Sequence, residues 1–382
     1  MLRPDGHHST QPNTPLPDNE LPSVARRYAG AVTEQPHTAV TIYDVAKAAG
    51  VAPSTVSRTF ARPGRVNADT AARIRRIADE LGYRANPIGQ ALSTSQTRLI
   101  GLMVSDVANP FYSQLIRGAQ LAATEAGYEI LLADSRESGT RERTALERLV
   151  PVVEGFVIGS SRMSDSALRN IAKQRPMVVL NRALLDVPSV VTDNAGGMRA
   201  AVELLRELGH DSVVYVAGPE ASWPDGMRFR ALRDLGTSSG LGVQKVGPYL
   251  PTFEGGLAAS RVLLERLPTA VIAYNDLMAI GVMHGFLAEG VRIPEQVSVI
   301  GFDDILISRL VLPSLTTVAA PMRQMGATAV NNVVALIKGA RHRAEEAMVM
   351  PVQLKVRGST AQRSRKRVSP ALGTTMVSGS AS

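Results

Sequence analysis

The chain has no cysteine and no long apolar run, and these two absences exclude several classes of protein. Without cysteine there can be no disulfide, no thiolate nucleophile and no cysteine-ligated zinc site. No run of 18 or more apolar residues occurs, so we expect no membrane-spanning segment. The first 20 residues lack the apolar core of a signal peptide, so we expect no secretion. At 382 residues the chain is long enough for more than one domain.

The motifs of common catalytic sites are also missing. The sequence contains no G-x-x-x-x-G-K-[ST] phosphate loop and no H-E-x-x-H, and no G-x-S-x-G elbow follows a predicted strand. The glycines of GFVIG, residues 155–159, do not make a dinucleotide fingerprint. The adjacent His7 and His8 have no further ligand at a supporting spacing. We therefore expect no enzyme activity, no cofactor and no metal site.

Positive charge is present, and it is concentrated in one short region. The formal net charge is +8. Residues 39–98 carry nine basic and four acidic side chains, and the stretch from Ser359 onward adds four basic ones. Residues 99–358 are close to neutral. A small basic region of this kind is typical of phosphate binding.

The most informative stretch is TIYDVAKAAGVAPSTVSRTF, residues 41–60. Ile42, Val45 and Ala46 have the i, i+3, i+4 spacing of one helical face. Gly50 can adopt the left-handed conformation that ends a helix, and the short polar residues after it begin another. This pattern predicts a helix-turn-helix whose second helix enters the major groove of DNA.

Capping residues extend this prediction to a three-helix domain. Thr41 can cap the first helix, with Asp44 as its capping-box partner. Asn67 can cap a third helix that runs to Leu81, and Gly82 would end it. Three helices in about forty-five residues predict a small domain with a thin core.

From about residue 98, apolar segments of strand length alternate with helices. Nearly continuous apolar strands separated by helices predict a parallel sheet covered on both faces. The alternation occurs in two sets, which predicts two doubly wound lobes. Ligands of such sheets bind beyond the carboxyl ends of the strands. The polar residues predicted there are Asp106 to Asn109, Asp134, Asn181 with Arg182, Asp193, Asn275 with Asp276, and Asp303 with Asp304.

The 41–60 motif is followed at a fixed distance by LGYRANPIGQAL, residues 81–92. Together they resemble the DNA-binding headpiece and hinge of the LacI/GalR family of bacterial transcription regulators. The resemblance continues to about Arg357. It implies an α/β fold with two doubly wound parallel-sheet lobes, like type I periplasmic binding proteins, preceded by a small all-α helix-turn-helix headpiece.

This resemblance divides the chain into five expected parts. They are a disordered tail at 1–38, the headpiece at 39–84, a hinge at 85–97, an effector-binding and dimerisation core at 98–358, and a disordered basic tail at 359–382. The expected lobes of the core are about 98–195 with 322–349, and about 196–318 with 350–358, the latter ending in a strand at 350–357.

The resemblance also implies which residues contact DNA. They are Thr41, Tyr43, Pro53, Ser54, Thr55, Ser57, Arg58, Arg65, Asn67, Asn86 and Leu92. Arg58 can pair with guanine through two hydrogen bonds. The alternative for Ser54, Thr55 and Ser57 is helix capping and contact with solvent.

The hinge of the family folds into a helix on operator DNA and pushes a leucine into the minor groove. Leu92 occupies that position, and such wedges unstack a base step and bend the duplex. The alternative is a linker residue without a role. This sequence departs from the family at Gly89, because glycine in a helix costs up to about 1 kcal/mol relative to alanine. We therefore expect a hinge that becomes ordered only on DNA.

The resemblance further implies an effector site between the lobes. Its expected residues are Phe111, Tyr112, Asn181, Arg228, Phe253, Asn275 and Asp303. Carboxylate, guanidinium and amide groups together suit vicinal hydroxyls, so we expect a sugar or a sugar derivative. For Asn181 and Asp303 the alternative is capping of the following helix. For Asp276 and Asp304 we favour a structural role.

These inferences predict a repressor that binds a palindromic operator as a homodimer, with DNA affinity controlled by the effector. An activator, a dual regulator and a soluble ligand receptor are the alternatives. The expected partners are double-stranded operator DNA, a sugar-like effector and a second copy of the chain, with a tetramer left open and no membrane. The expected location is the cytoplasm, at the nucleoid.

The hinge yields a first prediction. Leu92→Ala should weaken binding to specific operator DNA far more than binding to non-specific DNA, because only a bent specific complex uses the wedge. Gel-shift titrations on both kinds of DNA would measure this. Equal losses on the two would contradict the wedge.

Overall fold

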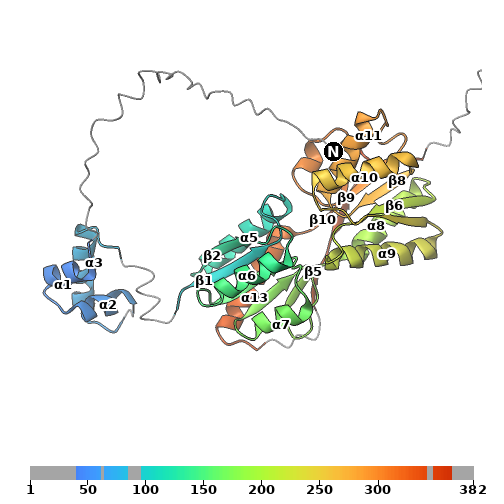
Figure 1. Cartoon of the computed structure of the whole chain (residues 1–382). Coiled ribbons are helices and arrows are strands. Elements are labelled where there is room, and N and C mark those ends of the chain that lie inside the picture. The colour runs from blue at the N-terminus through green and yellow to red at the C-terminus, as the bar shows by residue number, and fades with distance from the viewer. Residues whose placement is uncertain (1–39, 62–63, 85–95, 342–346, 364–382) are drawn as a thin grey trace, which may run out of the picture. The chain divides into compact units, whose positions relative to one another are not determined.

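The computed structural model describes residues 40–61, 64–84, 96–341 and 347–363 (Figure 1). They divide into two units between Asn86 and Pro87, and each unit is described by itself. The expected N-terminal tail and most of the expected hinge, with Asn86 and Leu92, lie outside the described residues. No helix among the described residues is long and apolar enough to cross a membrane.

The first unit is the headpiece. Its described helices are α1 (Ile42–Ala49), α2 (Pro53–Ala61) and α3 (Ala68–Glu80). Val45, Val56 and Ile74, one from each helix, are fully buried against one another. The predicted three-helix domain is therefore confirmed.

The ends of the headpiece helices follow the capping signals in the sequence. The Asp44 carboxylate accepts hydrogen bonds from the backbone N–H of Thr41 at 2.8 Å and from its hydroxyl at 2.7 Å. Gly50 ends α1 with a φ of 63°, a conformation that glycine adopts without steric cost. These local contacts set the turn that leads into α2.

The second unit consists of two α/β lobes, which we call lobe 1 and lobe 2. The six-stranded sheet of lobe 1 has the order β11-β5-β4-β3-β1-β2. Its strands are β1 (Leu99–Val104), β2 (Glu129–Asp134), β3 (Gly155–Gly159), β4 (Met177–Leu180), β5 (Ser189–Thr192) and β11 (Met348–Met350). All of its strand pairs are parallel. Its helices are α5 (Phe111–Glu125), α6 (Gly139–Leu149), α7 (Asp165–Ala172) and α13 (Met322–Ile337).

The six-stranded sheet of lobe 2 has the order β12-β10-β9-β8-β6-β7. Its strands are β6 (Ser212–Val216), β7 (Gly242–Val246), β8 (Ala270–Ala273), β9 (Ser298–Asp303), β10 (Thr316–Ala319) and β12 (Gln353–Lys355). Only β12, at the edge, runs antiparallel to its neighbour. Its helices are α8 (Asn194–Glu207), α9 (Trp223–Ser239), α10 (Phe253–Glu265), α11 (Asp276–Ala288) and the short α12 (Ile307–Leu310).

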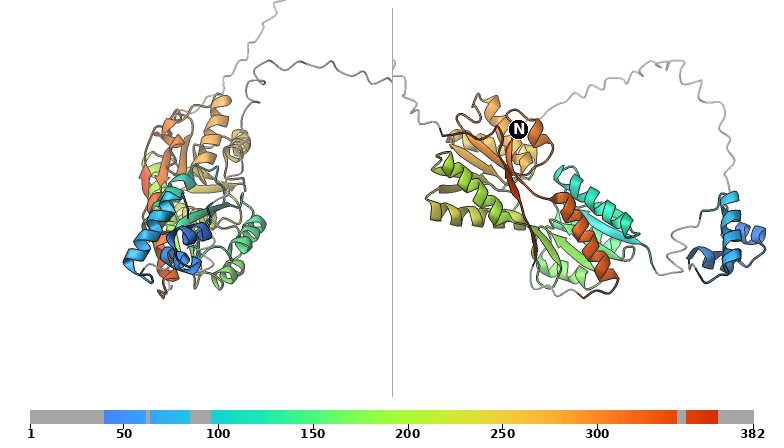
Figure 2. Two further views of the ribbon diagram at one scale, coloured as in Figure 1. Left: turned by 90° about the vertical axis from the view of Figure 1, so that its left-hand side faces the viewer. Right: turned by 180° about the vertical axis from the view of Figure 1, so that it is seen from behind.

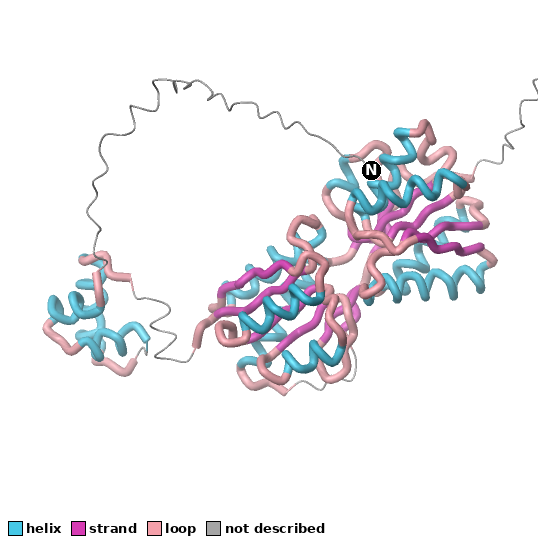
Figure 3. The backbone as a smooth tube through the Cα atoms, in the orientation of Figure 1, coloured by secondary structure: helices cyan, strands magenta, loops and turns pink. Residues whose placement is uncertain are grey.

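Helices cover both faces of each sheet, as Figure 3 shows by the strands lying between them. The central strands are buried throughout because both of their faces are covered. The predicted pair of doubly wound lobes is confirmed.

The described chain crosses between the lobes at three places, after β5, after β10 and after β11. The second crossing brings α13 from lobe 2 back to lobe 1, where it packs beside α5 (Figure 2). Because each lobe is completed by segments from distant parts of the sequence, neither is a continuous stretch of chain.

The predicted final strand at 350–357 was wrong in one respect. The structure has two strands there, β11 in the sheet of lobe 1 and β12 in that of lobe 2. Met350 pairs with Thr192 and belongs to lobe 1. The prediction failed because the sequence shows a single apolar stretch there. The division of this stretch into β11 and β12 depends on the chain crossing from lobe 1 to lobe 2.

The predicted disordered tail begins too early, because residues 359–363 are ordered. Ser359 is fully buried, and its hydroxyl donates to the carbonyl oxygen of Val299 at 2.6 Å. It also accepts a hydrogen bond from the backbone N–H of Thr316 at 2.8 Å. Arg363 forms an ion pair with Asp211. Basic, small residues suggested a solvated tail, but their polar groups bind the edge of lobe 2. The residues beyond 363 lie outside the described part.

The crossing of α5 and α13 depends on two glycines. A Cβ on Gly118 would lie 1.9 Å from the carbonyl oxygen of Arg323, and one on Gly326 would lie 2.1 Å from that of Leu115. Both obstacles are backbone atoms, so a side chain would force the helices apart.

Gly118→Ala should therefore lower the free energy of unfolding of the core by about 1–3 kcal/mol, the usual result of overpacking. Urea unfolding would measure it. The matched control is Gly226→Ala on α9, where a Cβ would meet nothing within 4 Å. That change should stabilise the protein by up to about 1 kcal/mol, the helix preference for alanine. Equal effects of the two substitutions would contradict the close crossing.

Candidate functional site

In the headpiece, α2 presents most of its predicted DNA-contacting residues away from the core. Its buried residues are Val56 and Thr59. The other predicted DNA contacts in the described headpiece are exposed or half-buried. The exposed ones are Thr41, Tyr43, Ser54, Arg58, Arg65 and Asn67, and the half-buried ones are Pro53, Thr55 and Ser57.

Two of these residues also have structural roles. Asn67 caps α3, because its side-chain oxygen accepts hydrogen bonds from the N–H groups of Asp69 at 3.0 Å and Thr70 at 3.4 Å. Thr41 is engaged with Asp44 at the start of α1. Tyr43, by contrast, is 70% exposed although it is aromatic. An exposed aromatic on a basic domain is available to a nucleic acid.

In the core, a narrow cleft collects polar side chains from both lobes at the carboxyl ends of their strands. From lobe 1 it is lined by Asn109, Phe111, Tyr112, Glu137, Ser160, Arg162 and Asn181. From lobe 2 it is lined by Pro224, Arg228, Pro251, Tyr274, Asn275 and Asp303. We call this set the interlobe cleft. Six of the seven predicted effector residues belong to it.

The seventh, Phe253, does not line the interlobe cleft. It begins α10, and its ring lies 5.3 Å from that of His284 on α11. Pro251, two residues earlier, occupies the cleft wall. The prediction for Phe253 was wrong because the sequence did not show the register of the loop before α10.

Arg228 is rigidly held in the interlobe cleft. Its Nε donates to the side-chain oxygen of Asn194 at 2.9 Å, and its Nη1 donates to the carbonyl oxygen of Tyr274 at 2.5 Å. The guanidinium lies 3.4 Å from the ring centroid of Phe302, a cation–π contact. The side chain is therefore preorganised as a donor without needing a ligand to position it.

Asp303 ends β9 beside Arg228. Burial raises the pKa of Asp303 well above its usual value, Arg228 opposes this rise, and the charge of Asp276 adds to it. Asp276 is fully buried, and its carboxylate accepts hydrogen bonds from the Thr317 hydroxyl at 2.6 Å and the Ile305 N–H at 2.9 Å. Asp276 thus has a structural role, and Asp303 is the carboxyl group of lobe 2 that lines the cleft.

The side-chain amides of Asn275 and Asn181 form hydrogen bonds within the protein. Asn275 caps α11 by accepting from the Met278 N–H at 2.9 Å, and it donates to the Pro251 carbonyl at 3.0 Å. Asn181 donates to the Ser160 hydroxyl at 3.1 Å. Each amide is therefore oriented by the surrounding chain.

Sequence reasoning missed an ion pair in this cleft. Arg162 Nε donates to the Glu137 carboxylate at 2.7 Å, and their side chains are 5% and 17% exposed. Both residues follow strands of lobe 1, three residues after the end of each. The rule that ligands bind beyond strand ends would have found them if it had been extended past the first polar residue.

Backbone strain is concentrated in the interlobe cleft. Among the described residues, eight that are not glycine have positive φ, and four of these line the cleft. Their φ values are 58° for Glu137, 52° for Ser160, 56° for Asn181 and 121° for Asp303. Non-glycine residues rarely adopt such values, and they do so mostly at functional sites. This clustering makes the cleft the candidate ligand site of the core.

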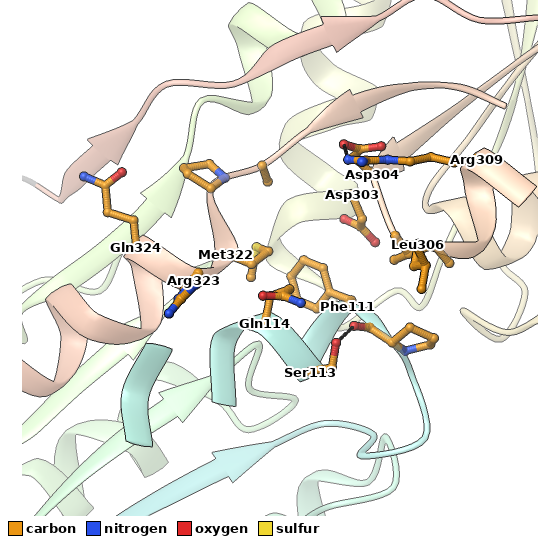
Figure 4. Close-up of a pocket in the computed structure, with 14 residues that line it drawn as sticks. Phe111, Ser113, Gln114, Asp303, Asp304, Leu306, Arg309, Met322, Arg323 and Gln324 are labelled. Atoms are coloured by element: carbon orange, nitrogen blue, oxygen red, sulfur yellow. Dashed lines mark hydrogen bonds and ion pairs between the residues drawn. The ribbon is translucent and has the colours of Figure 1, made fainter. Parts of the chain in front are cut away.

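The interlobe cleft has about 20 Å³ of free space, little more than a single water needs (~10–15 Å³). Beside it lies a larger cavity of about 500 Å³, which shares Phe111 and Asp303 with the cleft. Figure 4 shows the Asp303 side chain directed toward Phe111, next to the ion pair of Asp304 with Arg309. Room for a ligand therefore lies directly beside the polar groups.

Comparison with known proteins agrees with both units. Residues 41–86 match the family described as bacterial regulatory proteins, lacI family. Residues 202–360 match the periplasmic binding protein-like domain.

Individual relatives match over nearly their whole length. The HTH-type transcriptional repressor CytR of Escherichia coli (strain K12) is 32% identical over 333 residues, which cover 85% of this chain and 97% of CytR. A crystal structure of the lac repressor dimer bound to operator and the anti-inducer ONPF superposes with a TM-score of 0.75. It is 27% identical, with 85% of this chain and 99% of that chain covered.

A complex of the regulator CelR with cellobiose has a TM-score of 0.62 at 30% identity, covering 84% of this chain and 99% of that one. The fold, the headpiece and the cleft thus define a ligand-responsive DNA-binding protein. The chain belongs to the lacI family of bacterial regulatory proteins, and it is a DNA-binding transcriptional regulator.

The buried Asp276 yields a prediction about pH. Burial raises its pKa to about 7, so the folded protein binds this proton more tightly than the unfolded chain does. Stability should therefore fall as the pH rises from about 4 through 7. The slope for one such group is at most about 1.4 kcal/mol per pH unit.

Asp276→Asn should flatten this dependence, because the amide keeps one acceptor and does not ionise. Urea unfolding between pH 5.5 and 8 would measure the slope. The matched control is Asp234→Asn, on the exposed face of α9, which should leave the slope unchanged. A slope that is identical in the Asp276 variant and the parent would contradict the assignment.

Proposed function

We propose that the protein is a repressor that binds a palindromic operator as a homodimer, under the control of a sugar or sugar derivative held in the interlobe cleft. The observation that carries the effector site is the clustering of strained polar residues at the strand ends of both lobes. Family membership supports the operator, and the cellobiose complex of CelR is a precedent for the effector class.

The dimer has a physical rationale in the headpiece. Apart from the residues used as caps, a single headpiece exposes few candidates for base contact, among them Ser54 and Arg58. Two headpieces on a two-fold axis would read both halves of a palindrome and double the phosphate contacts.

The interlobe cleft supplies the means of control. A ligand that contacts Arg228 and Asp303 in lobe 2 together with Asn181 in lobe 1 favours one separation of the lobes over others. It shifts DNA affinity only by its differential affinity for the DNA-binding and non-binding states. The same geometry serves an inducer or a corepressor.

A binding role accounts for the cleft better than catalysis does. No histidine, lysine or cysteine lines it among the described residues. The Ser160 hydroxyl is bonded to the Asn181 amide, which is not a general base. The protein is therefore proposed to act by binding alone, in the cytoplasm, where its operator is.

Operator binding is tested by gel-shift titration against a library of palindromic sites at several salt concentrations. Selection of a preferred sequence is expected, with affinity that falls as salt rises because phosphate contacts release counterions. Binding without any sequence preference would instead favour a soluble ligand receptor.

The effector site yields a further prediction. Arg228→Ala and Asp303→Ala should each weaken the effector response at least tenfold while leaving operator affinity within about twofold. A lost hydrogen bond to a charged group costs about 1.5–3 kcal/mol. The effector is first identified by thermal-shift screening of sugars, sugar acids and nucleobases, and the response is then measured by gel shift.

The matched control is Arg230→Ala, because Arg230 lies on the same helix as Arg228 but is exposed. Retained operator binding shows that each variant is folded. A normal effector response in both the Arg228 and the Asp303 variants would show that the effector binds elsewhere.

A further inference from the structure

The ion pair of Glu137 with Arg162 has no part in the effector site as predicted from the sequence. Arg162 donates from Nε to Glu137 at 2.7 Å and from Nη1 to the carbonyl oxygen of Ser160 at 3.0 Å. A guanidinium has five N–H groups. The others have no bonded acceptor among the described residues, and Arg162 lines the interlobe cleft. Arg162 thus offers hydrogen-bond donors to a ligand while its charge is compensated by Glu137.

The surroundings hold Arg162 in this position. Its backbone N–H donates to the carboxylate of Glu142 at 2.8 Å, and Glu142 is itself buried. Burial lowers the pKa of Arg162, whereas Tyr274 and Glu137 raise it by a larger amount. The pKa of Arg162 is therefore above its usual value, and the side chain stays charged. The guanidinium cannot avoid an incoming ligand by losing its proton.

Glu137 is held with equal firmness. Its backbone N–H donates to the carbonyl oxygen of Ser105 at 2.7 Å, and both it and Arg136 have positive φ, at 58° and 48°. Two consecutive non-glycine residues in the left-handed region are unfavourable, and they persist only where the fold imposes them. The turn after β2 therefore places the Glu137 carboxylate within hydrogen-bond distance of Arg162.

The interlobe cleft contains two pairs of ionisable side chains, and the pair in lobe 1 is an ion pair. Each lobe contributes one guanidinium and one carboxyl group, Arg162 with Glu137 and Arg228 with Asp303. An anionic ligand approaching Arg162 would meet the carboxylate of Glu137 in a poorly solvated site, where like charges repel strongly. A hydroxyl group meets no such penalty and can both donate and accept.

We propose that Glu137 sets the charge specificity of the effector site. By occupying Arg162, it restricts the interlobe cleft to uncharged polyhydroxy ligands and excludes sugar phosphates and sugar acids. This inference rests on the proposed effector site, and it adds to it the charge class of the ligand and the residue that selects it.

Glu137→Gln tests the proposal, because it removes the negative charge and keeps the size of the side chain. Inorganic phosphate is the probe, and the full-length protein is titrated with it by calorimetry at fixed ionic strength. The parent protein should show no saturable binding up to 10 mM phosphate. The variant should bind phosphate at least tenfold more tightly than that limit, because Arg162 is then an uncompensated cation.

Two further variants identify the cause. Glu147→Gln removes the same charge from an exposed position on α6 of lobe 1 and should behave as the parent does. The double variant Glu137→Gln/Arg162→Gln should lose the gained phosphate binding. Circular dichroism spectra that match the parent show that each variant is folded.

The proposal is overturned if Glu137→Gln binds phosphate no more tightly than the parent, or if the double variant binds it equally well. It is also overturned if the parent binds D-ribose 5-phosphate more tightly than D-ribose. None of these measurements involves DNA. A failure of operator binding would therefore count against the proposed function. The charge specificity of the cleft would still be decided by the titrations with phosphate and ribose.

Discussion

The interlobe cleft depends on the way in which Arg228 is held. Asn194 and Tyr274 accept hydrogen bonds from two of its guanidinium nitrogens, and Phe302 lies against its face. This arrangement needs the start of α8 and the ends of β8 and β9 to meet, so it forms only when lobe 2 is complete. The charge of Arg228 in turn limits the rise in the pKa of Asp303. Lobe 2 thus places the fixed cation Arg228 beside the carboxyl group of Asp303.

Lobe 1 holds its cation in the cleft in a different way. Its cation, Arg162, is paired directly with Glu137 at 2.7 Å, and its polar residues reach the cleft through left-handed turns after β2, β3 and β4. The two halves of the cleft are thus unequal. Lobe 1 presents a neutralised surface of donors and hydroxyls, whereas in lobe 2 burial raises the pKa of Asp303.

The fold was largely predictable because its signals are local. The helix caps at Asp44, Gly50 and Asn67, and the buried strands, follow from spacing and residue type alone. The placement of Phe253 and of the strand at 350–357 did not follow, because loop register and the third lobe crossing depend on the packed core. The ordered segment at 359–363 was missed for the same reason, since its hydrogen bonds go to residues far away in sequence.

The sequence by itself determined the helix-turn-helix and the two doubly wound lobes, because periodicity, caps and strand ends are encoded over a few residues. The family resemblance of the sequence indicated six residues of the interlobe cleft. Only the tertiary structure decided which polar groups face one another. The Glu137 and Arg162 side chains are separated by 25 positions and lie in different loops. Their pairing depends on the order of the strands in the sheet and on two strained turns, and neither can be predicted from a local sequence pattern.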